Sequence, residues 1–375
     1  MKIAIDARVL NKGITGTGRY LMNILDGLQS CSSTHDFYLL TSNIELFNGS
    51  NYKIIPIKEP KHLDKVYSPF WLNILLPKLL KELDFDIYFT TNILVPIVNL
   101  PKTKRISVVH DVIHKVHKQY YPLSYRAYLD LFLPRSLKLS DRIITVSEHS
   151  KMDISRYYKI DLERISIVHA NGATNLRPLN SAECVDIERI RKKYNLPQKF
   201  ILFVGSLENR KNIVSLIKIA EKLNIKGIDL PLVLIGKPGY GFNQYKKTID
   251  ENSRFVKHLG FVDDQDLVYI YNAAFALVFP SFYEGFGIPP LEAMKCGVPV
   301  LASNTSSLPE VIGTGGILVD PTDIDGFVDE LIKLHSDNNY YLMMKTRGLE
   351  RSQIFSIKKS AEALIKIFDN INKTI

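Results

Sequence analysis

The chain has 375 residues, of which 46% are hydrophobic and 23% charged, and its formal net charge is +9. This length suits two domains, and the composition is that of a soluble globular protein, so no disorder is expected beyond the termini. Three cysteines far apart in the sequence exclude a disulfide framework, and no apolar run reaches the ~20 residues that a membrane-spanning helix needs.

The excess positive charge lies entirely in the first half of the chain. Residues 1–195 hold 28 Lys and Arg against 19 Asp and Glu, whereas residues 196–375 hold 20 of each kind. A basic half beside a neutral one predicts an anionic partner for the first half, such as a lipid surface or a pyrophosphate, although a merely solvated surface has the same composition. Nucleic-acid binding has only this charge in its favour. The start, MKIAIDARVL, reads as a buried strand and not as a signal peptide, so a cytoplasmic location is expected.

Short apolar runs alternate with helix-like stretches, which is typical of βα units with parallel strands. In the first half the expected strands cover residues 2–5, 37–40, 53–57, 86–89, 106–109, 143–146 and 165–168. After a polar stretch at 180–199, with an expected helix at 186–194, strands are expected at 200–204, 232–235, 276–279, 298–301 and 317–319. This restart predicts two doubly wound α/β domains that join near residues 180–198. Ligands of such sheets bind beyond the carboxyl ends of the strands, where the chemistry is therefore expected.

Two glutamates follow the expected strand at 276–279. Pro289 and Pro290 suit a helix start and Gly297 its end, which places Glu292 in the first turn of that helix. Glu284 precedes the helix in a loop, and the glycines between the two glutamates allow close backbone approach. A helix start can bind a phosphate and a carboxylate can bind a diol, so the segment suits a nucleotide sugar. A surface glutamate favoured by the helix dipole, beside turn-forming glycines, is the alternative.

The run E-G-F-G-I-P-P-L-E at 284–292 resembles the E-x7-E signature of family 4 retaining glycosyltransferases, which have the GT-B fold. Further segments match this family in the same order along nearly the whole chain: Gly13 with G-T-G-R-Y at 16–20, H-D at 110–111, T-V-S-E at 145–148, N-G at 171–172, G-S-L-E-N-R-K-N at 205–212, L-G-F-V at 259–262 and L-P-E-V at 308–311. The resemblance implies two doubly wound Rossmann-like domains that face each other across a cleft. It implies an acceptor-side domain at 1–190, a donor-binding domain at 191–354, and a C-terminal helix within 355–375 that packs back on the first domain.

The resemblance also implies roles for single residues. His110 and Glu284 are the candidates for chemistry: His110 holds a hydroxyl of the donor sugar, and Glu284 positions and polarises that sugar. Lys211 follows the first strand of the second domain, where a cation can reach a diphosphate. Many members carry an arginine directly after the preceding glycine, where this chain has Ser206, so Arg210 is expected to supply that charge instead.

The remaining expected contacts with the nucleotide and phosphates come from main-chain amides and neighbouring side chains. The expected donor-side residues besides Arg210 and Lys211 are Gly16, Gly18, Ser206, Phe261, Val262, Phe286, Gly287, Ile288 and Glu292, with Glu292 on the ribose. Thr17 and Asp111 are expected on the acceptor side. Residues 16–18 are expected to form a turn, and their spacing from Gly13 does not fit the G-x-G-x-x-G fingerprint, which disfavours a nicotinamide enzyme.

No metal or other cofactor is expected. His110, His114 and His117 lie close in sequence, but loop geometry is the preferred reading of this triplet over a metal site. The segments HDVIHKVHKQYYP and GSLENRKN resemble those of bacterial mannosyltransferases that build O-antigen or other surface polysaccharides. GDP-mannose is therefore the expected donor, with UDP- or dTDP-sugars as alternatives. The expected acceptor is a saccharide or a polyprenyl-linked saccharide.

Two other classes of function and a membrane contact stay open. A nucleotide-sugar epimerase or phosphorylase could share the fold, and so could a non-catalytic saccharide-binding subunit. Residues 65–83 mix aromatic, aliphatic and lysine side chains at roughly helical spacing, so they suit either an anionic membrane interface or a helix packed on the sheet. Peripheral contact with the inner face of the cell membrane is the corresponding expectation.

Overall fold

The structure is a computed structural model that describes residues 1–11, 15–58, 69–180 and 183–371, without the side chain of Cys184. These residues form two compact units. Unit 1 comprises Met1–Lys115, Pro122–Ala170 and Ser356–Ile375, and unit 2 comprises Val116–Tyr121 and Asn171–Phe355. The chain therefore passes from the first unit to the second at residues 170–171 and returns at residues 355–356, and the short segment Val116–Tyr121 also belongs to the second unit.

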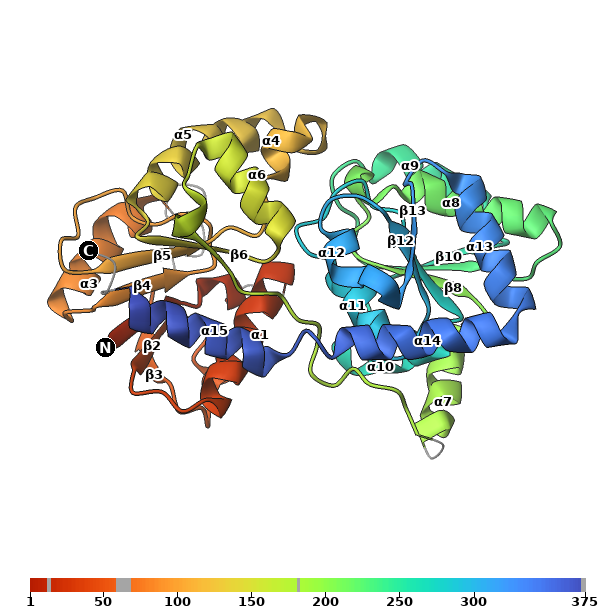
Figure 1. The fold of residues 1–375 in the computed structure, drawn as a ribbon, viewed down its shortest axis with the longest axis horizontal. Helices are drawn as coiled ribbons and strands as arrows, with labels where there is room; N and C mark the ends of the chain where they lie inside the picture. The colour runs from red at the N-terminus through yellow and green to blue at the C-terminus, as the bar shows by residue number, and fades with distance from the viewer. Residues whose placement is uncertain (12–14, 59–68, 181–182, 372–375) are drawn as a thin grey trace. The chain divides into compact units, whose positions relative to one another are not determined.

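Unit 1 contains a parallel sheet with the strand order β3-β2-β1-β4-β5-β6-β7. Its strands are β1 (Lys2–Asp6), β2 (Asp36–Thr41), β3 (Lys53–Pro56), β4 (Ile87–Thr90), β5 (Lys104–Val108), β6 (Arg142–Thr145) and β7 (Ile165–Ile167). Helices described in this unit include α1 (Gly16–Ser30), α3 (Leu76–Glu82), α4 (Ile113–Val116), α5 (Leu123–Leu139), α6 (Glu148–Tyr158) and α15 (Ile357–Asn370). Helices lie on both faces of the sheet, and β4 is accordingly buried along its whole length (Figure 1).

Unit 2 contains a second parallel sheet, with the strand order β10-β9-β8-β11-β12-β13. Its strands are β8 (Ile201–Val204), β9 (Leu232–Ile235), β10 (Val256–Gly260), β11 (Ala276–Phe279), β12 (Val300–Ser303) and β13 (Ile317–Val319). Its described helices include α7 (Cys184–Tyr194), α8 (Ile213–Ile225), α9 (Asn243–Glu251), α10 (Asp264–Ala273), α11 (Ile288–Lys295), α12 (Leu308–Ile312), α13 (Ile324–Ser336) and α14 (Asn338–Ser352). Both units are thus doubly wound α/β layers.

The strand order reverses direction in the middle of each sheet. In unit 2 the chain builds outward from β8 through β9 to β10, and then starts again on the other side of β8 with β11. The loops after β8 and β11 therefore leave the sheet toward opposite faces, and a crevice opens between their strand ends. In unit 1 the corresponding point lies between β1 and β4.

The expected strands and the expected helix at 186–194 are confirmed, with ends that differ by one or two residues. One strand was missed: β10, with the sequence VKHLG, has only one buried residue because it lies at the edge of the sheet. An edge strand needs no continuous apolar run, so periodicity did not reveal it. The expected turn at residues 16–18 was wrong, since these residues are the first turn of α1.

The C-terminal helix α15 packs along α1 within unit 1, as the blue and red helices in Figure 1 show. The contact requires a glycine, because a Cβ atom on Gly27 would lie 2.7 Å from Cβ of Ala361. At the end of the helix, the ring of Phe368 is fully buried between those of Phe37 and Phe89. The last helix that the structure describes is therefore part of the core formed by the first strands.

Only part of the segment proposed for a membrane interface is described. Residues 65–68 of the stretch 65–83 lie outside the described residues, and the rest forms a helical turn at Trp71–Leu75 followed by α3. Trp71 is buried, whereas Phe70 and Ile74 are about half exposed. Among the described residues, no helix combines the length and the apolar character that crossing a bilayer requires.

Candidate functional site

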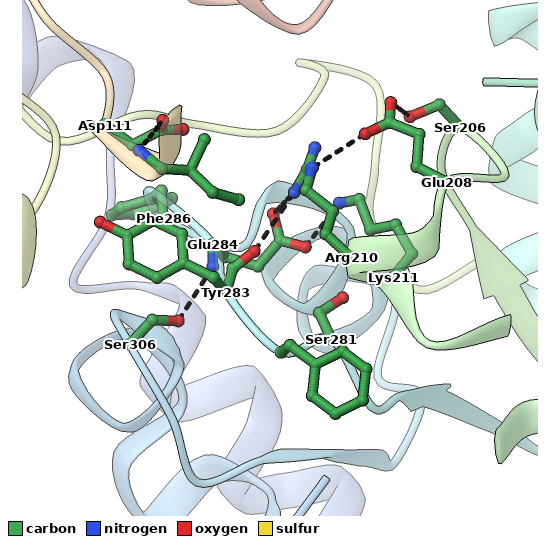
Figure 2. Close-up of polar contacts among 12 residues, drawn as sticks. Asp111, Ser206, Glu208, Arg210, Lys211, Ser281, Tyr283, Glu284, Phe286 and Ser306 are labelled. Atoms are coloured by element: carbon green, nitrogen blue, oxygen red, sulfur yellow. Dashed lines mark hydrogen bonds and ion pairs between the residues drawn. The ribbon is translucent and has the colours of Figure 1, made fainter. Parts of the chain in front are cut away.

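The loops after β8 and β11 bring two cations and a carboxylate together in unit 2. Arg210 and Lys211 end a short helical turn after β8, and Glu284 lies in the loop between β11 and α11. The Nζ atom of Lys211 lies 2.6 Å from Oε1 of Glu284, and Nη1 of Arg210 lies 3.0 Å from its Oε2 (Figure 2). These side chains meet where the strand order reverses, which is where ligands of such sheets bind.

The cluster is largely removed from solvent. The side chains of Lys211 and Glu284 are 7% and 9% exposed, and Lys211 Nζ also lies 4.8 Å from the centre of the Phe279 ring. Burial by itself raises the pKa of Glu284, but the charges of Lys211 and Arg210 outweigh burial and hold that pKa below its ordinary value. Glu284 is therefore ionised at neutral pH, and the site holds fixed charges in a weakly screened environment.

The loop that carries Glu284 is held by two serines after β12. The main-chain N–H of Glu284 donates to Oγ of Ser306 at 2.9 Å. The hydroxyl of Ser307 donates to the carbonyl oxygens of Glu284 and Phe286, at 2.9 and 2.8 Å. Neither serine was predicted from the sequence, because both lie several residues beyond the expected strand at 298–301. These hydrogen bonds hold the main chain of the loop and thereby the position of the Glu284 side chain.

Glu292 lies in a different environment from Glu284. It is the fifth residue of α11, so it begins the second turn and does not lie in the first turn as expected. Its carboxylate is buried and accepts hydrogen bonds from the N–H of Ala173 at 3.0 Å and the hydroxyl of Tyr271 at 2.9 Å. A Cβ atom on Gly172 would lie 2.4 Å from Cγ of Glu292, which explains the glycine of the N-G segment. The ribose contact expected for Glu292 stays a prediction.

The start of α11 offers fewer amides than a helix start usually does. Gly287 precedes the helix with φ +112, and a Cβ atom there would lie 2.7 Å from Leu308 Cδ2, so only glycine fits. Ile288 is the first residue of the helix, and Pro289 and Pro290, which follow it, have no N–H. Any phosphate at this helix start would therefore depend on the amides of Ile288 and the preceding loop.

The other donor-side candidates of unit 2 differ in how far their side chains are exposed to solvent. Phe261 follows β10 with 62% of its surface exposed, and Lys237 Nζ lies 4.7 Å from the centre of its ring. Val262 is buried. The ring of Phe286 packs edge-on against Phe355, at 5.4 Å between centroids, so a contact with a ligand would have to come from its main chain. An exposed aromatic side chain is therefore available at Phe261 but not at Phe286.

In unit 1, His110 follows β5 and has a buried, unsatisfied ring nitrogen. Its Nε2 atom has no hydrogen-bond partner within the described part of the chain, and its ring meets that of Tyr20 edge-on at 4.9 Å. Burial lowers the pKa of His110 to about 4, so the imidazole is neutral at physiological pH. The next residue, Asp111, accepts a hydrogen bond from the N–H of Ile113 at 3.1 Å. A neutral imidazole with an unused nitrogen can hold a ligand hydroxyl.

The glycine-rich candidates lie at the start of α1. Thr15 caps the helix by accepting a hydrogen bond from the N–H of Gly18 at 3.3 Å. Gly16 has open space where a Cβ atom would be, and Thr17 is half-buried beside it. Gly13 lies outside the described residues. This helix start is positively polarised, so the expected approach of a phosphate or an acceptor to it stays a prediction.

The histidines that follow His110 in sequence have other surroundings. His114 Nε2 lies 2.7 Å from the hydroxyl of Tyr158, and the ring of His117 meets that of Tyr283 at 5.6 Å between centroids. Among residues 1–11, 15–58, 69–180 and 183–371, no group of three or more His, Cys, Asp or Glu side chains could hold a metal ion.

One buried ionic network in unit 1 was not predicted from the sequence. Asp6 ends β1 and is fully buried, and it accepts hydrogen bonds from Arg8 Nε at 2.9 Å, Arg8 Nη2 at 2.7 Å and the hydroxyl of Tyr88 at 2.8 Å. The Arg8 guanidinium also lies 3.7 Å from the centre of the Trp71 ring. The A-I-D-A-R sequence at the end of a predicted strand was the available signal. The network fixes the carboxyl end of β1.

Comparison with known proteins identifies the family. Residues 14–170 match the model described as Glycosyltransferase Family 4, and residues 186–351 match that of Glycosyl transferases group 1. The chain is 30% identical to the O-antigen chain mannosyltransferase B of Escherichia coli, with 95% of this chain and 96% of that protein covered. It is 28% identical to the O-antigen chain mannosyltransferase RfbU of Salmonella typhimurium, with 84% and 85% covered.

Solved structures agree on the fold. The crystal structure of Anabaena Alr3699/HepE in complex with UDP and glucose superimposes with a TM-score of 0.74 at 16% identity, covering 99% of this chain and 100% of that chain. The two parallel sheets of this protein thus have the GT-B architecture expected from the sequence. From its family matches, its full-length relatives and its fold, the chain belongs to glycosyltransferase family 4 and is a glycosyltransferase.

Proposed function

We propose that this enzyme transfers a hexosyl group, with retention of configuration, from a nucleotide sugar to a saccharide or lipid-linked saccharide of a bacterial surface polysaccharide. The observation that carries the proposal is the buried cluster of Lys211, Arg210 and Glu284 between the ends of β8 and β11. Mannose from GDP-mannose is the favoured donor, because two relatives that cover most of the chain are named mannosyltransferases. The HepE structure with UDP and glucose supports UDP-sugars as the alternative.

In the proposed reaction, Lys211 and Arg210 bind the diphosphate of the donor. When the bond from the sugar to the phosphate breaks, negative charge grows on the leaving diphosphate, and two preorganised cations in a weakly screened site stabilise that charge. Arginine suits this task because its planar guanidinium donates to two phosphate oxygens at once. Glu284, at the same point, is proposed to position the sugar and to stabilise positive charge on its ring.

The remaining roles follow from hydrogen-bonding capacity. His110 is neutral and has an unsatisfied Nε2, so it is proposed to hold a sugar hydroxyl without adding charge. Glu292 is proposed to bind the ribose, and Phe261 and Val262 to lie near the base. The acceptor hydroxyl attacks from the face that the diphosphate leaves, and a phosphate oxygen of the leaving group takes its proton. Thr17 and Asp111 are proposed on the acceptor side.

The donor can be identified by thermal stabilisation followed by product analysis. GDP, UDP and dTDP, with GDP-mannose, UDP-glucose and dTDP-rhamnose, are each added to the protein, because a ligand at 100 times its Kd stabilises the folded state by about 2.7 kcal/mol. We expect the GDP compounds to raise the melting temperature most, and GDP-mannose to give a mannosylated product. Lys211→Ala should lower turnover by orders of magnitude without loss of fold. A protein that no nucleotide stabilises would contradict the proposed function.

A further inference from the structure

The loop after β8 contains a second carboxylate, Glu208, beside the cation pair. Its Oε2 atom accepts a hydrogen bond from Nε of Arg210 at 2.9 Å, and its Oε1 atom accepts one from the hydroxyl of Ser206 (Figure 2). The side chains of Glu208 and Arg210 are 23% and 18% exposed. Glu208 therefore holds the inner nitrogen of the guanidinium whose outer nitrogen, Nη1, contacts Glu284.

The neighbouring loop after β9 is shaped to admit this carboxylate. The N–H of Leu207 donates to the carbonyl oxygen of Lys237, and the N–H of Gly239 donates to that of Leu207, both at 3.0 Å. A Cβ atom on Gly239 would lie 2.4 Å from Cγ of Glu208 and 3.3 Å from its Cδ. Any other residue at this position would push Glu208 away from its present place. Two loops thus define where the carboxylate lies.

A guanidinium held at Nε has a fixed direction for its two outer nitrogens. Long side chains such as arginine lose much rotamer freedom when they bind, and a second contact made in advance reduces that loss. Glu284 cannot serve as this fixed contact, because a diphosphate that binds Arg210 and Lys211 must take its place on them. Glu208 contacts a different edge of the guanidinium, so it can keep Arg210 in position while the outer nitrogens exchange Glu284 for phosphate.

We propose that Glu208 is a positioning residue that aims Arg210 at the diphosphate of the donor. The proposal rests on the proposed function, in which Arg210 binds that diphosphate. Arg210 stands four residues beyond Ser206, and the contact with Glu208 gives it a defined orientation. Arg210 can therefore supply the charge that an arginine at position 206 would otherwise provide. A carboxylate that served only as a competing negative charge would have the opposite effect, because its removal would tighten diphosphate binding.

Two variants separate the effect of the length of the Glu208 side chain from the effect of its charge. Glu208→Gln keeps an oxygen at the same distance but loses the charge, whereas Glu208→Asp keeps the charge but is shorter by one methylene. We expect kcat/KM with the donor to stay within about threefold for Glu208→Gln and to fall about tenfold for both Glu208→Asp and Glu208→Ala. Asp325→Ala, which removes an exposed ion pair with Lys222 on the same unit, is the matched control and should have no effect.

A double-mutant cycle then tests whether Glu208 acts through Arg210. The loss caused by Glu208→Ala should shrink to less than about twofold in an Arg210→Ala background, because the residue to be positioned is gone. Equal losses in both backgrounds would overturn the proposal, as would tighter binding of nucleoside diphosphate by Glu208→Ala in calorimetry. Melting temperatures of all variants show whether a loss reflects unfolding instead. A wild-type protein that binds no nucleotide would overturn the proposed function itself, and this inference with it.

Discussion

Glu284 contacts both cations of the site with a single carboxylate. Its two oxygens each contact one of Lys211 and Arg210, and its own N–H is held by Ser306. A diphosphate must therefore compete with this carboxylate, and on binding it frees Glu284 to interact with the sugar. In the proposed reaction, one side chain would thus oppose binding of the leaving group and assist the transferred group.

This competition gives a prediction with opposite signs for two ligands. Glu284→Gln should bind free nucleoside diphosphate more tightly, by about tenfold or ~1.4 kcal/mol, because the competing charge is gone. Turnover of the nucleotide sugar should nevertheless fall by orders of magnitude. Calorimetry with the nucleoside diphosphate and steady-state kinetics measure the two effects, with Asp325→Asn as a control. Weaker diphosphate binding by the variant would refute the competition.

The Asp6 network predicts a different outcome, on stability. Burial raises the pKa of Asp6, but Arg8 and Tyr88 outweigh burial and lower that pKa below its ordinary value. Asp6→Asn leaves Arg8 without its counter-ion, so the variant should lose about 3–5 kcal/mol at pH 7. The stability due to ionised Asp6 is fully present above the unfolded-state pKa of ~3.9 and is lost as the pH falls through the lower folded-state value.

Urea denaturation at pH 7 and at acid pH measures this difference. The wild type and Asp6→Asn should converge in stability once Asp6 is protonated. Asp36→Asn breaks an exposed ion pair with Lys53 in the same unit, and its stability should hardly change. An Asp6→Asn protein as stable as the wild type at pH 7 would show that the network contributes nothing.

At the scale of the secondary-structure elements, α15 contributes to the stability of unit 1. It is the last helix that the structure describes, yet it packs against α1 through Gly27 and brings Phe368 against Phe37 of β2 and Phe89 of β4. Its Ser360 hydroxyl also donates to the carbonyl oxygen of His169 at 2.9 Å, close to where the chain leaves unit 1. Unit 1 therefore includes residues from both ends of the described sequence.

Phe368→Ala tests this element. The variant removes a fully buried ring, so unit 1 should lose about 3–5 kcal/mol. Hydrogen exchange should then show lower protection in α1 and β1–β4, and unchanged protection in β8–β13. Leu342→Ala on α14, where the side chain is half exposed, is the control and should alter neither unit. Equal loss of protection in both units would contradict the assignment of α15 to unit 1 alone.

At the scale of the whole molecule, the net charge differs between the two halves of the sequence. The excess of nine positive charges lies in residues 1–195, which include most of unit 1, whereas residues 196–375 are balanced. An acceptor linked to a lipid would bring the enzyme to an anionic membrane surface. Charge asymmetry of this kind favours such an approach without any membrane-spanning segment.

Vesicle co-sedimentation measures this prediction. The protein should bind vesicles that contain an anionic lipid and not neutral vesicles of the same size. Binding should fall steeply between low salt and 0.5 M salt, since the screening length drops from about 10 Å at 0.1 M toward about 3 Å at 1 M. Binding to neutral vesicles that salt does not weaken would point to the exposed Phe70 and Ile74 instead of charge.

By itself, the sequence determined the fold class and which candidate site residues follow the ends of the strands. Parallel strands buried on both faces need apolar runs, and the ligand edge of such sheets lies where the runs end, so the pattern of the chain alone places Lys211 and Glu284 at that edge. The strand β10 was not predicted, because only one of its residues is buried and its sequence therefore has no continuous apolar run. The start of α1 at residues 16–18 was not predicted as helical, because two glycines in three residues are typical of turns.

Only the tertiary structure decided how the site residues pair. Glu208, Ser306 and Ser307 come from loops whose local sequences show no periodic signal. The two serines bind the main chain of another loop, whereas Glu208 meets Ser206 and Arg210 of its own loop. The two glutamates of the E-x7-E run look alike in sequence, yet Glu284 meets two cations while Glu292 meets a tyrosine and a main-chain amide. Local sequence sets which residues reach the edge of a sheet, but side-chain partners depend on contacts between segments far apart in the chain, which periodicity does not encode.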